Sequence, residues 1–104
     1  MKRFIFILTA LLLATTTMMA AEFRLGKLTF KTISDTKVEL TKADKSVTQV
    51  YINPTVTYNG RTYSVTTIGD YAFYGCYRLT SVTVPAHTQI DEDAFPDHTE
   101  VIRK

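Results

Sequence analysis

The chain has 104 residues, of which 12 are Lys or Arg, 10 are Asp or Glu and one is cysteine. Two of the bases, Lys2 and Arg3, lie in an N-terminal segment of separate character, and the rest of the chain carries no net charge. Binding to nucleic acid is not expected, because phosphate contacts need an excess of Lys and Arg, and a lone cysteine excludes a disulfide within the chain.

Residues 1–21 have the organisation of a secretory signal peptide. Two bases are followed by an apolar run at 4–13 and then by small or weakly polar, uncharged residues. A membrane-spanning helix needs roughly 20 apolar residues, and this run is about half that length. We expect export to the periplasm, the cell surface or the medium, with cleavage after Ala20 or Ala21 and no membrane span afterwards.

The next segment alternates between apolar and polar residues, which is typical of strands with one buried face. Leu28 and Phe30 belong to one run, and Val38 and Leu40 belong to the next. The Ser-Asp-Thr triplet between the two runs favours a turn. We predict a β-hairpin here, as part of an N-terminal cap that spans residues 22–46.

A second β unit begins near residue 50 and is interrupted at Pro54, whose nitrogen cannot donate to a neighbouring strand. The strongest local signal follows it. Asn59-Gly60 lies between two alternating runs, and both residue types accept the positive φ of a type I′ turn. In the resulting hairpin, Val56 is expected to face Tyr63 as a buried cross-strand pair.

The C-terminal part contains a repeat. Ile68-Gly69-Asp70-Tyr71-Ala72-Phe73 returns 22 residues later as Ile90-Asp91-Glu92-Asp93-Ala94-Phe95, and a period of about 20–29 residues is that of leucine-rich repeats. Phe73, Cys76 and Leu79 are spaced by three, as on one side of a short helical or 3₁₀ turn. Val82 and Val84 are spaced by two, as in a strand. We predict one solenoid coil with these five side chains inside.

The pattern Ile68-Gly69-x-x-Ala72-Phe73-x-x-Cys76-x-x-Leu79-x-Ser81-Val82-x-Val84-Pro85 resembles the repeat of BspA-type leucine-rich repeat proteins. The segment from Val56 to Gly69 is similar to the one that often leads into the first repeat of such proteins. The resemblance covers residues 47–104. The second copy departs from the pattern, with Asp91 in place of Gly69 and a shortened strand.

This resemblance implies a mostly-β fold, in which N-terminal hairpins lead into a short right-handed solenoid with helical or 3₁₀ turns. It also implies a secreted or surface-exposed, adhesin-like binding module for a protein, extracellular-matrix or cell-surface ligand. The alternatives are a self-associating structural protein of the envelope and a truncated repeat protein without an independent function. A solenoid normally needs about three repeats, so the hairpins or another copy must supply the missing packing.

No catalytic, cofactor or metal site is predicted. Cys76 falls among apolar positions, where a thiol acts as a small core residue. His87 and His98 lack the close spacing of a zinc motif, and the acidic run at 91–97 lacks the glycine of an EF-hand. The sequence also has no G-x-S-x-G elbow and no phosphate-binding glycine loop, so we expect no enzymatic activity.

Two sets of three residues are candidate ligand-binding surfaces. One set recurs every three residues beside the buried positions and should emerge on the outside of the turn: Tyr71, Tyr74 and Tyr77. The other alternates with buried strand residues: Tyr51, Ser81 and Thr83. Tyrosine is common in binding hot spots. The alternative is that the turn tyrosines cover the edge of the core or pack on the hairpins.

Charge is divided unevenly along the chain. Residues 22–62 contain seven bases and four acids, whereas residues 63–104 contain three bases and six acids. This division favours contact between opposite ends of two copies, or with partners of opposite sign. It is also compatible with ordinary solvated surface.

Overall fold

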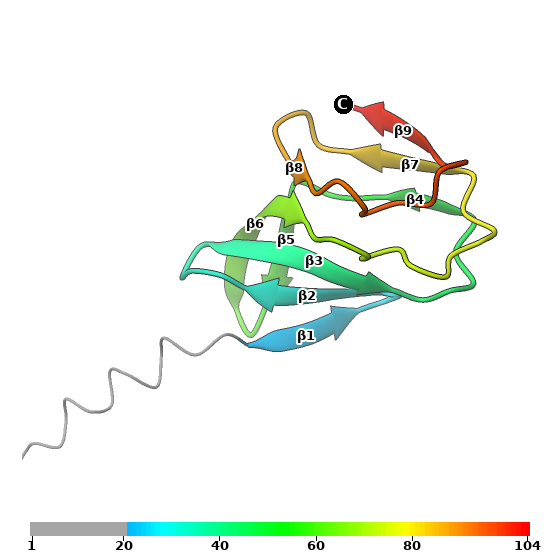
Figure 1. Ribbon diagram of the computed structural model, residues 1–104. Coiled ribbons are helices and arrows are strands. Elements are labelled where there is room, and N and C mark those ends of the chain that lie inside the picture. Colours follow the sequence, from blue (N-terminus) through cyan, green and yellow to red (C-terminus); the bar gives the residue numbers. More distant parts are fainter. Residues whose placement is uncertain (1–20) are drawn as a thin grey trace, which may run out of the picture.

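Figure 1 shows the computed structural model, which describes residues 21–104. The predicted signal peptide lies outside these residues except for Ala21. Strands and turns make up the described part, and none of it forms a helix long and apolar enough to cross a membrane. The strands are β1 (Glu22–Leu25), β2 (Leu28–Thr32), β3 (Lys37–Ala43), β4 (Gln49–Tyr51), β5 (Thr55–Tyr58), β6 (Arg61–Ile68), β7 (Ser81–Val84), β8 (Gln89–Ile90) and β9 (Glu100–Arg103).

The first sheet is built around three parallel strands. β3 pairs with β6, and β6 pairs with β8, so that Leu40, Ile68 and Ile90 occupy equivalent positions. β2 and β1 extend this sheet beyond β3 as antiparallel strands. β5 pairs antiparallel with the first half of β6, along the edge that β8 uses further on.

The second sheet has the order β4-β7-β9, and its three strands are parallel. Val50, Val82 and Val101 occupy equivalent positions in it. The chain passes from β3 to β4, from β6 to β7 and from β8 to β9 through turns that lie beside one another (Figure 1). The fold therefore places the three parallel strands of the first sheet and the three of the second on opposite sides of one core.

These crossings define three coils, at residues 37–51, 61–84 and 89–103. The second coil is the one that matches the leucine-rich repeat pattern, and the third contains its degenerate copy. The first coil had not been recognised in the sequence. It runs across residue 46, the predicted end of the N-terminal cap. The division into a cap at 22–46 and a repeat region at 47–104 stays a prediction.

The predicted interior of the second coil is confirmed. Its five inward side chains have no solvent-exposed area: Phe73, Cys76, Leu79, Val82 and Val84. Phe73 also packs against Phe95 of the third coil, with ring centroids 4.9 Å apart. Stacking therefore joins the second and third coils through aromatic contact as well as through strand pairing.

Both predicted hairpins are present. Phe30 faces Leu40 across β2 and β3, and Val56 faces Tyr63 across β5 and β6, although the second pair is half-buried and not fully enclosed. The turn residues Asn59 and Gly60 have φ values of 52° and 75°. Positive φ at both central positions is the signature of a type I′ turn.

The turn of the second coil differs from the sequence prediction, which expected a short helical or 3₁₀ segment. Bonds of the i+3 to i type do form, for example from the Cys76 amide to the Phe73 carbonyl (3.1 Å) and from the Leu79 amide to the Cys76 carbonyl (3.1 Å). They form isolated turns and no continuous helix. Tyr71 and Gly75 have φ values of 61° and 82°, and positive φ interrupts a right-handed helical path.

β1 was not predicted, and it covers the lower end of the first sheet (Figure 1). Its Phe23 side chain stacks on Tyr58 at a centroid distance of 4.1 Å and on Phe30 at 5.8 Å. Phe23 is 5% exposed. This aromatic cluster closes one end of the core with an antiparallel hairpin and thereby supplies packing that a short solenoid lacks.

A threonine precedes each strand of the second sheet, at positions 48, 80 and 99. The Thr80 amide and hydroxyl donate to the Thr48 carbonyl at 2.8 and 3.0 Å. The Thr99 hydroxyl donates to the Leu79 carbonyl at 2.9 Å, and the Glu100 amide donates to the Thr80 carbonyl at 2.9 Å. These bonds hold successive coils in register where the second sheet begins.

Replacing Phe73 by Ala should destabilise the fold severely, because it removes a fully buried ring and its contact with Phe95. Such changes typically cost about 3–5 kcal/mol of unfolding free energy. The measurement is urea denaturation followed by circular dichroism. Tyr77→Ala, in the same coil but 76% exposed, should change the unfolding free energy by less than about 0.5 kcal/mol. Equal effects of the two substitutions would contradict the coil packing.

Cys76 should be unreactive in the folded protein. Burial raises the pKa of the Cys76 thiol above its ordinary value, and the nearby Asp44 carboxylate raises it further. The thiol also lies 3.6 Å from the Asp44 carbonyl, to which it donates. Because the thiolate is the reactive form, a thiol reagent at pH 8 should label Cys76 no faster than the protein unfolds.

The same pKa shift has a consequence for stability. A thiol with a higher pKa in the folded state stabilises the fold below the pKa of the unfolded thiol, which is about 8.5. That contribution to stability is lost as the pH rises through the pKa of the thiol in the folded protein. Unfolding free energy should therefore fall above about pH 8.5, and Cys76→Ala should reduce this fall. Rapid labelling of the native protein would show that the thiol is accessible.

Candidate interaction surfaces

The six predicted site residues fall on two separate surfaces. Tyr51, Ser81 and Thr83 lie on the second sheet, which we call the strand surface. The other three lie on the turn that leads from β6 into β7, which we call the turn surface: Tyr71, Tyr74 and Tyr77. The two sets are therefore not parts of one site.

On the strand surface, Tyr51, Thr83 and Ile102 lie side by side across β4, β7 and β9. Tyr51 is 63% exposed, whereas Ser81 and Thr83 are half-buried. Ile102 was not among the predicted site residues, because its coil was regarded as degenerate. The alternation of Val101 and Ile102 matches that of Val82 and Thr83, and this was the signal that places Ile102 beside Thr83.

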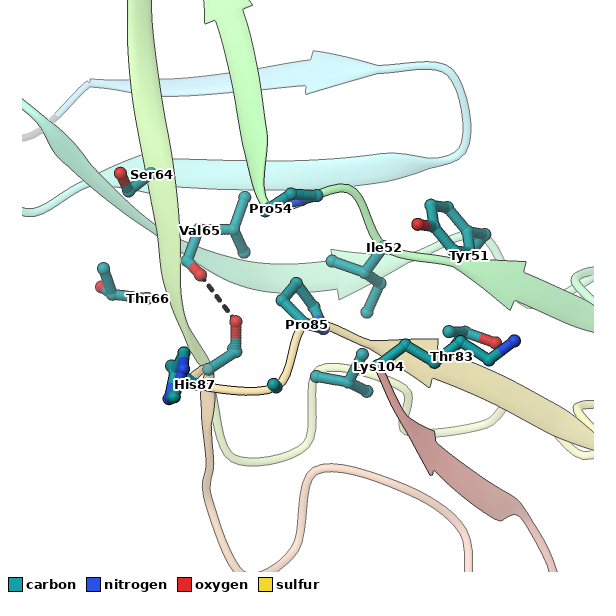
Figure 2. A pocket seen from close by; sticks show the side chains of 13 residues that line it. Tyr51, Ile52, Pro54, Ser64, Val65, Thr66, Thr83, Pro85, His87 and Lys104 are labelled. Carbon is teal, nitrogen blue, oxygen red and sulfur yellow. Dashed lines mark hydrogen bonds between the residues drawn. The ribbon is translucent and has the colours of Figure 1, made fainter.

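A groove of about 480 Å³ adjoins this row where β4 and β7 end. Figure 2 shows apolar side chains from two segments meeting in it: Ile52 and Pro54, which follow β4, and Pro85, which follows β7. Its rim carries hydroxyl, imidazole and ammonium groups, contributed by Tyr51, Ser64, Thr66, Thr83, His87 and Lys104. This groove is not foreseeable from the sequence, because it is assembled from β4 and the segment after it, β6, β7 and the segment after β7.

The segment at 85–88, which forms one wall of the groove, is held from two sides. The Thr88 hydroxyl donates to the Val65 carbonyl at 2.8 Å, as the dashed line in Figure 2 marks, and Thr88 is 3% exposed. Arg103 Nη1 donates to the carbonyls of Thr88 (2.7 Å), Ala86 (3.2 Å) and Pro85 (3.4 Å). The wall is therefore fixed before any ligand arrives.

The turn surface is a ridge of exposed aromatic side chains. Tyr71, Tyr74 and Tyr77 are 60%, 67% and 76% exposed. The first two rings meet edge to face, with centroids 6.1 Å apart and planes at 85°. With most of their surface in solvent, these tyrosines are not packed on the N-terminal hairpins. We refer to the three residues as the tyrosine ridge.

A hollow lies on each side of the tyrosine ridge. The one toward the first coil has a volume of about 540 Å³ and is lined by Lys42, Lys45 and Asp70 together with ridge residues. The one toward the third coil has a volume of about 180 Å³, and its lining includes Asp93 and Phe95. The ridge therefore separates a hollow with two lysines from one whose charged group is a carboxylate.

Asp44 is engaged within the turn of the first coil. The Ser46 hydroxyl and amide donate to its carboxylate at 2.6 and 2.8 Å, and these bonds, with Lys27 and Arg24 nearby, lower its pKa below the ordinary value. Arg24 Nη2 lies 3.4 Å from the same carboxylate. This is the single ion pair among residues 21–104.

The two histidines lie apart. His87 lines the groove, and His98 is an exposed residue of the third coil. Among the described residues, no three His, Cys, Asp or Glu side chains gather closely enough to hold a metal ion. Cys76 is enclosed in the core and contributes to neither surface.

Comparisons with known proteins agree with this architecture. No protein-family model and no curated protein matches the chain. A leucine-rich repeat protein from Bacteroides capillosus ATCC 29799 is 33% identical over 79% of this chain and 64% of its own, with a TM-score of 0.70. One from Bacteroides ovatus ATCC 8483 is 30% identical over 77% of this chain and 22% of its own, with a TM-score of 0.67.

A third structure is a leucine rich cell surface protein from Faecalibacterium prausnitzii A2-165. It is 29% identical over 81% of this chain and 24% of its own, with a TM-score of 0.68. The chain thus spans less than two thirds of the length of each of the three proteins. The stacked parallel strands, the repeat pattern of the second coil and these similarities lead to one conclusion: the chain is a leucine-rich repeat protein of the BspA type.

Proposed function

We propose that the chain is an exported protein-interaction module that binds a segment of a protein ligand in the groove beside the strand surface. The observation that carries this proposal is the groove itself, a preformed concavity of about 480 Å³ with an apolar floor and a polar rim. Binding sites are usually concave, largely apolar and fitted with a few oriented polar groups. The groove has each of these properties.

Its chemistry fits a polypeptide segment. Ile52, Pro54 and Pro85 offer an apolar floor for a side chain of the ligand, and the hydroxyls of Tyr51 and Thr83 stand at the rim to bond with backbone amides. Lys104 adds a cation at the same rim. Because the 85–88 wall is already held by Thr88 and Arg103, little ordering entropy is lost on binding.

An adhesin-like role at the cell surface is part of this proposal. The Faecalibacterium prausnitzii structure is described as a leucine rich cell surface protein, and the N-terminal segment of this chain has the pattern of an export signal. On this view the ligand belongs to the extracellular matrix or to another cell. The strand surface, with Tyr51 and Ile102 beside the groove, would widen the contact.

Tyr51→Ala should weaken ligand binding by about tenfold or more, because exposed tyrosines at a binding rim commonly contribute a large share of the binding energy. Binding is measured by biolayer interferometry, with the protein immobilised at low density against a panel of purified matrix proteins. Unfolding free energy should be nearly unchanged, since Tyr51 is 63% exposed.

Tyr74→Ala is the matched control, since it removes an equally exposed tyrosine from the turn surface. It should leave ligand binding unchanged. If Tyr74→Ala abolished binding and Tyr51→Ala did not, the ligand would use the tyrosine ridge and the groove proposal would be wrong. No binding to any matrix protein or intact cell would contradict the adhesin-like role.

Export should remove the N-terminal segment just before β1. Ala21 is tied to Thr32, whose amide donates to the Ala21 carbonyl at 2.9 Å, and β1 begins at Glu22. A cut after residue 20 therefore keeps this bond, and a cut after residue 21 removes it but leaves β1 whole. Mass spectrometry of the protein recovered outside the cytoplasm should give an N-terminus at Ala21 or Glu22.

The matched variant is Leu12→Arg, which places a charge in the apolar run that the export machinery reads. It should keep the unprocessed chain in the cytoplasm. Recovery of the unaltered chain from the cytoplasm at full length would contradict export.

A further inference from the structure

The three coils carry different charges where they meet the tyrosine ridge. The first coil presents Lys42 near the end of β3 and Lys45 in the turn that follows, and both are exposed. The one acid of that turn, Asp44, is engaged by Ser46 and Arg24. The third coil has five acids and no Lys or Arg between residues 91 and 100. The turn of the second coil lies between them and has one acid, Asp70, and one base, Arg78, so it carries no net charge. The turn surface is therefore cationic on one side of the ridge and anionic on the other.

These charges are not neutralised inside the molecule. Among residues 21–104 the structure holds one ion pair, Arg24 with Asp44, so Lys45 and Asp93 have no ionic partner in that part of the chain. Both side chains are exposed, and each lines a hollow beside the ridge. Two unpaired groups of opposite sign thus flank the same exposed aromatic surface.

We propose that the turn surface pairs two copies of this chain as an antiparallel, two-fold symmetric dimer. The symmetry axis passes through the tyrosine ridge of the second coil, so that the first coil of each copy faces the third coil of the other. Lys45 of one copy then meets Asp93 of its partner, and the reciprocal pair forms at the other end. This goes beyond the proposed ligand binding and uses a different surface.

The charges favour this position of the two-fold axis over an axis beside the first coil or beside the third coil. A two-fold contact is isologous, so every residue pair occurs twice, once in each direction. An axis beside the first coil would place lysines against lysines, and an axis beside the third coil would place carboxylates against carboxylates. Only an axis through the middle coil brings opposite charges together at both ends, because that coil separates the two charged sides.

The ridge supplies the apolar part of the contact. Tyr71 and Tyr74 already meet edge to face, and the rings of a second copy extend this packing, which is favourable between aromatic side chains. The aliphatic stem of Lys45 lies across Gly75, where an added β-carbon would stand 2.8 Å from Lys45 Cε. Gly75 thus lets the lysine lie against the ridge, with its ammonium group directed to the surface.

The dimer would leave both grooves open. The groove lies where β4 and β7 end, whereas the ridge belongs to the turn that precedes the beginning of β7. Pairing of the turn surfaces therefore presents two ligand grooves on one particle. A surface with many copies of the ligand would then bind the dimer more tightly than a single chain, through a raised effective concentration.

The first test measures the molecular mass of the purified protein by sedimentation equilibrium over a range of concentrations. The wild-type protein should reach the mass of two chains and no more. Lys45→Glu and Asp93→Lys should each raise the dimer dissociation constant by about tenfold or more, because two attractive contacts become repulsive. Raising the salt to 1 M should weaken the wild-type dimer.

The decisive test mixes the two single variants, Lys45→Glu and Asp93→Lys. Each variant repels its own copies. In a mixed pair, however, the introduced glutamate of one chain meets the introduced lysine of the other, and the native Lys45 meets the native Asp93. The mixture should therefore dimerise at a concentration at which each component alone is largely monomeric. The double variant, with Lys45→Glu and Asp93→Lys in one chain, should also regain the dimer.

Matched controls separate this proposal from the ligand groove. Tyr74→Ala should abolish the dimer and leave ligand binding intact, and Tyr51→Ala should do the reverse, with thermal unfolding verifying that all variants are folded. A wild-type protein that stays a monomer at millimolar concentration would overturn the proposal. So would growth beyond two copies, or a mixture of the two charge variants that remains monomeric.

Discussion

Every coil of this protein has two short strands whose inward side chains must be buried. They are buried by packing against the inward side chains of the neighbouring coil. The parallel pairing of β3, β6 and β8, and of β4, β7 and β9, keeps equivalent side chains at equivalent levels. A one-residue slip in either sheet would turn the inward side chains toward solvent. The core around Phe73 therefore depends on strand register, and the threonine bonds that precede the second sheet help to maintain it.

The parts that sequence predicted best are those in which local chemistry and distant packing demand the same residues. Asn59-Gly60 specifies its turn by backbone freedom alone, and the second coil carries its full repeat pattern. The first coil was missed because it shares little of that pattern apart from Thr48-Gln-Val50, which corresponds to Thr80-Ser-Val82. β1 was missed because its few residues directly follow the export segment, where no alternation over a longer stretch was available.

The candidate site shows the same division. Exposure of the tyrosine ridge followed from its spacing beside the buried positions of the second coil. The groove could not be predicted from residue spacing, because its lining comes from segments that are distant in sequence and meet only when the coils stack. Arg103 illustrates the limit most clearly: nothing local in the sequence indicates that this side chain reaches back to three carbonyls of the segment after β7.

The antiparallel hairpin of β1 and β2 gives the solenoid a direction. It occupies the side of β3 on which a further parallel strand of the first sheet would have to add, and Phe23 seals the core there. On the opposite side, β9 pairs with one neighbour in the described part of the chain. Gene duplication can therefore lengthen such a scaffold by whole coils at one end without disturbing the other.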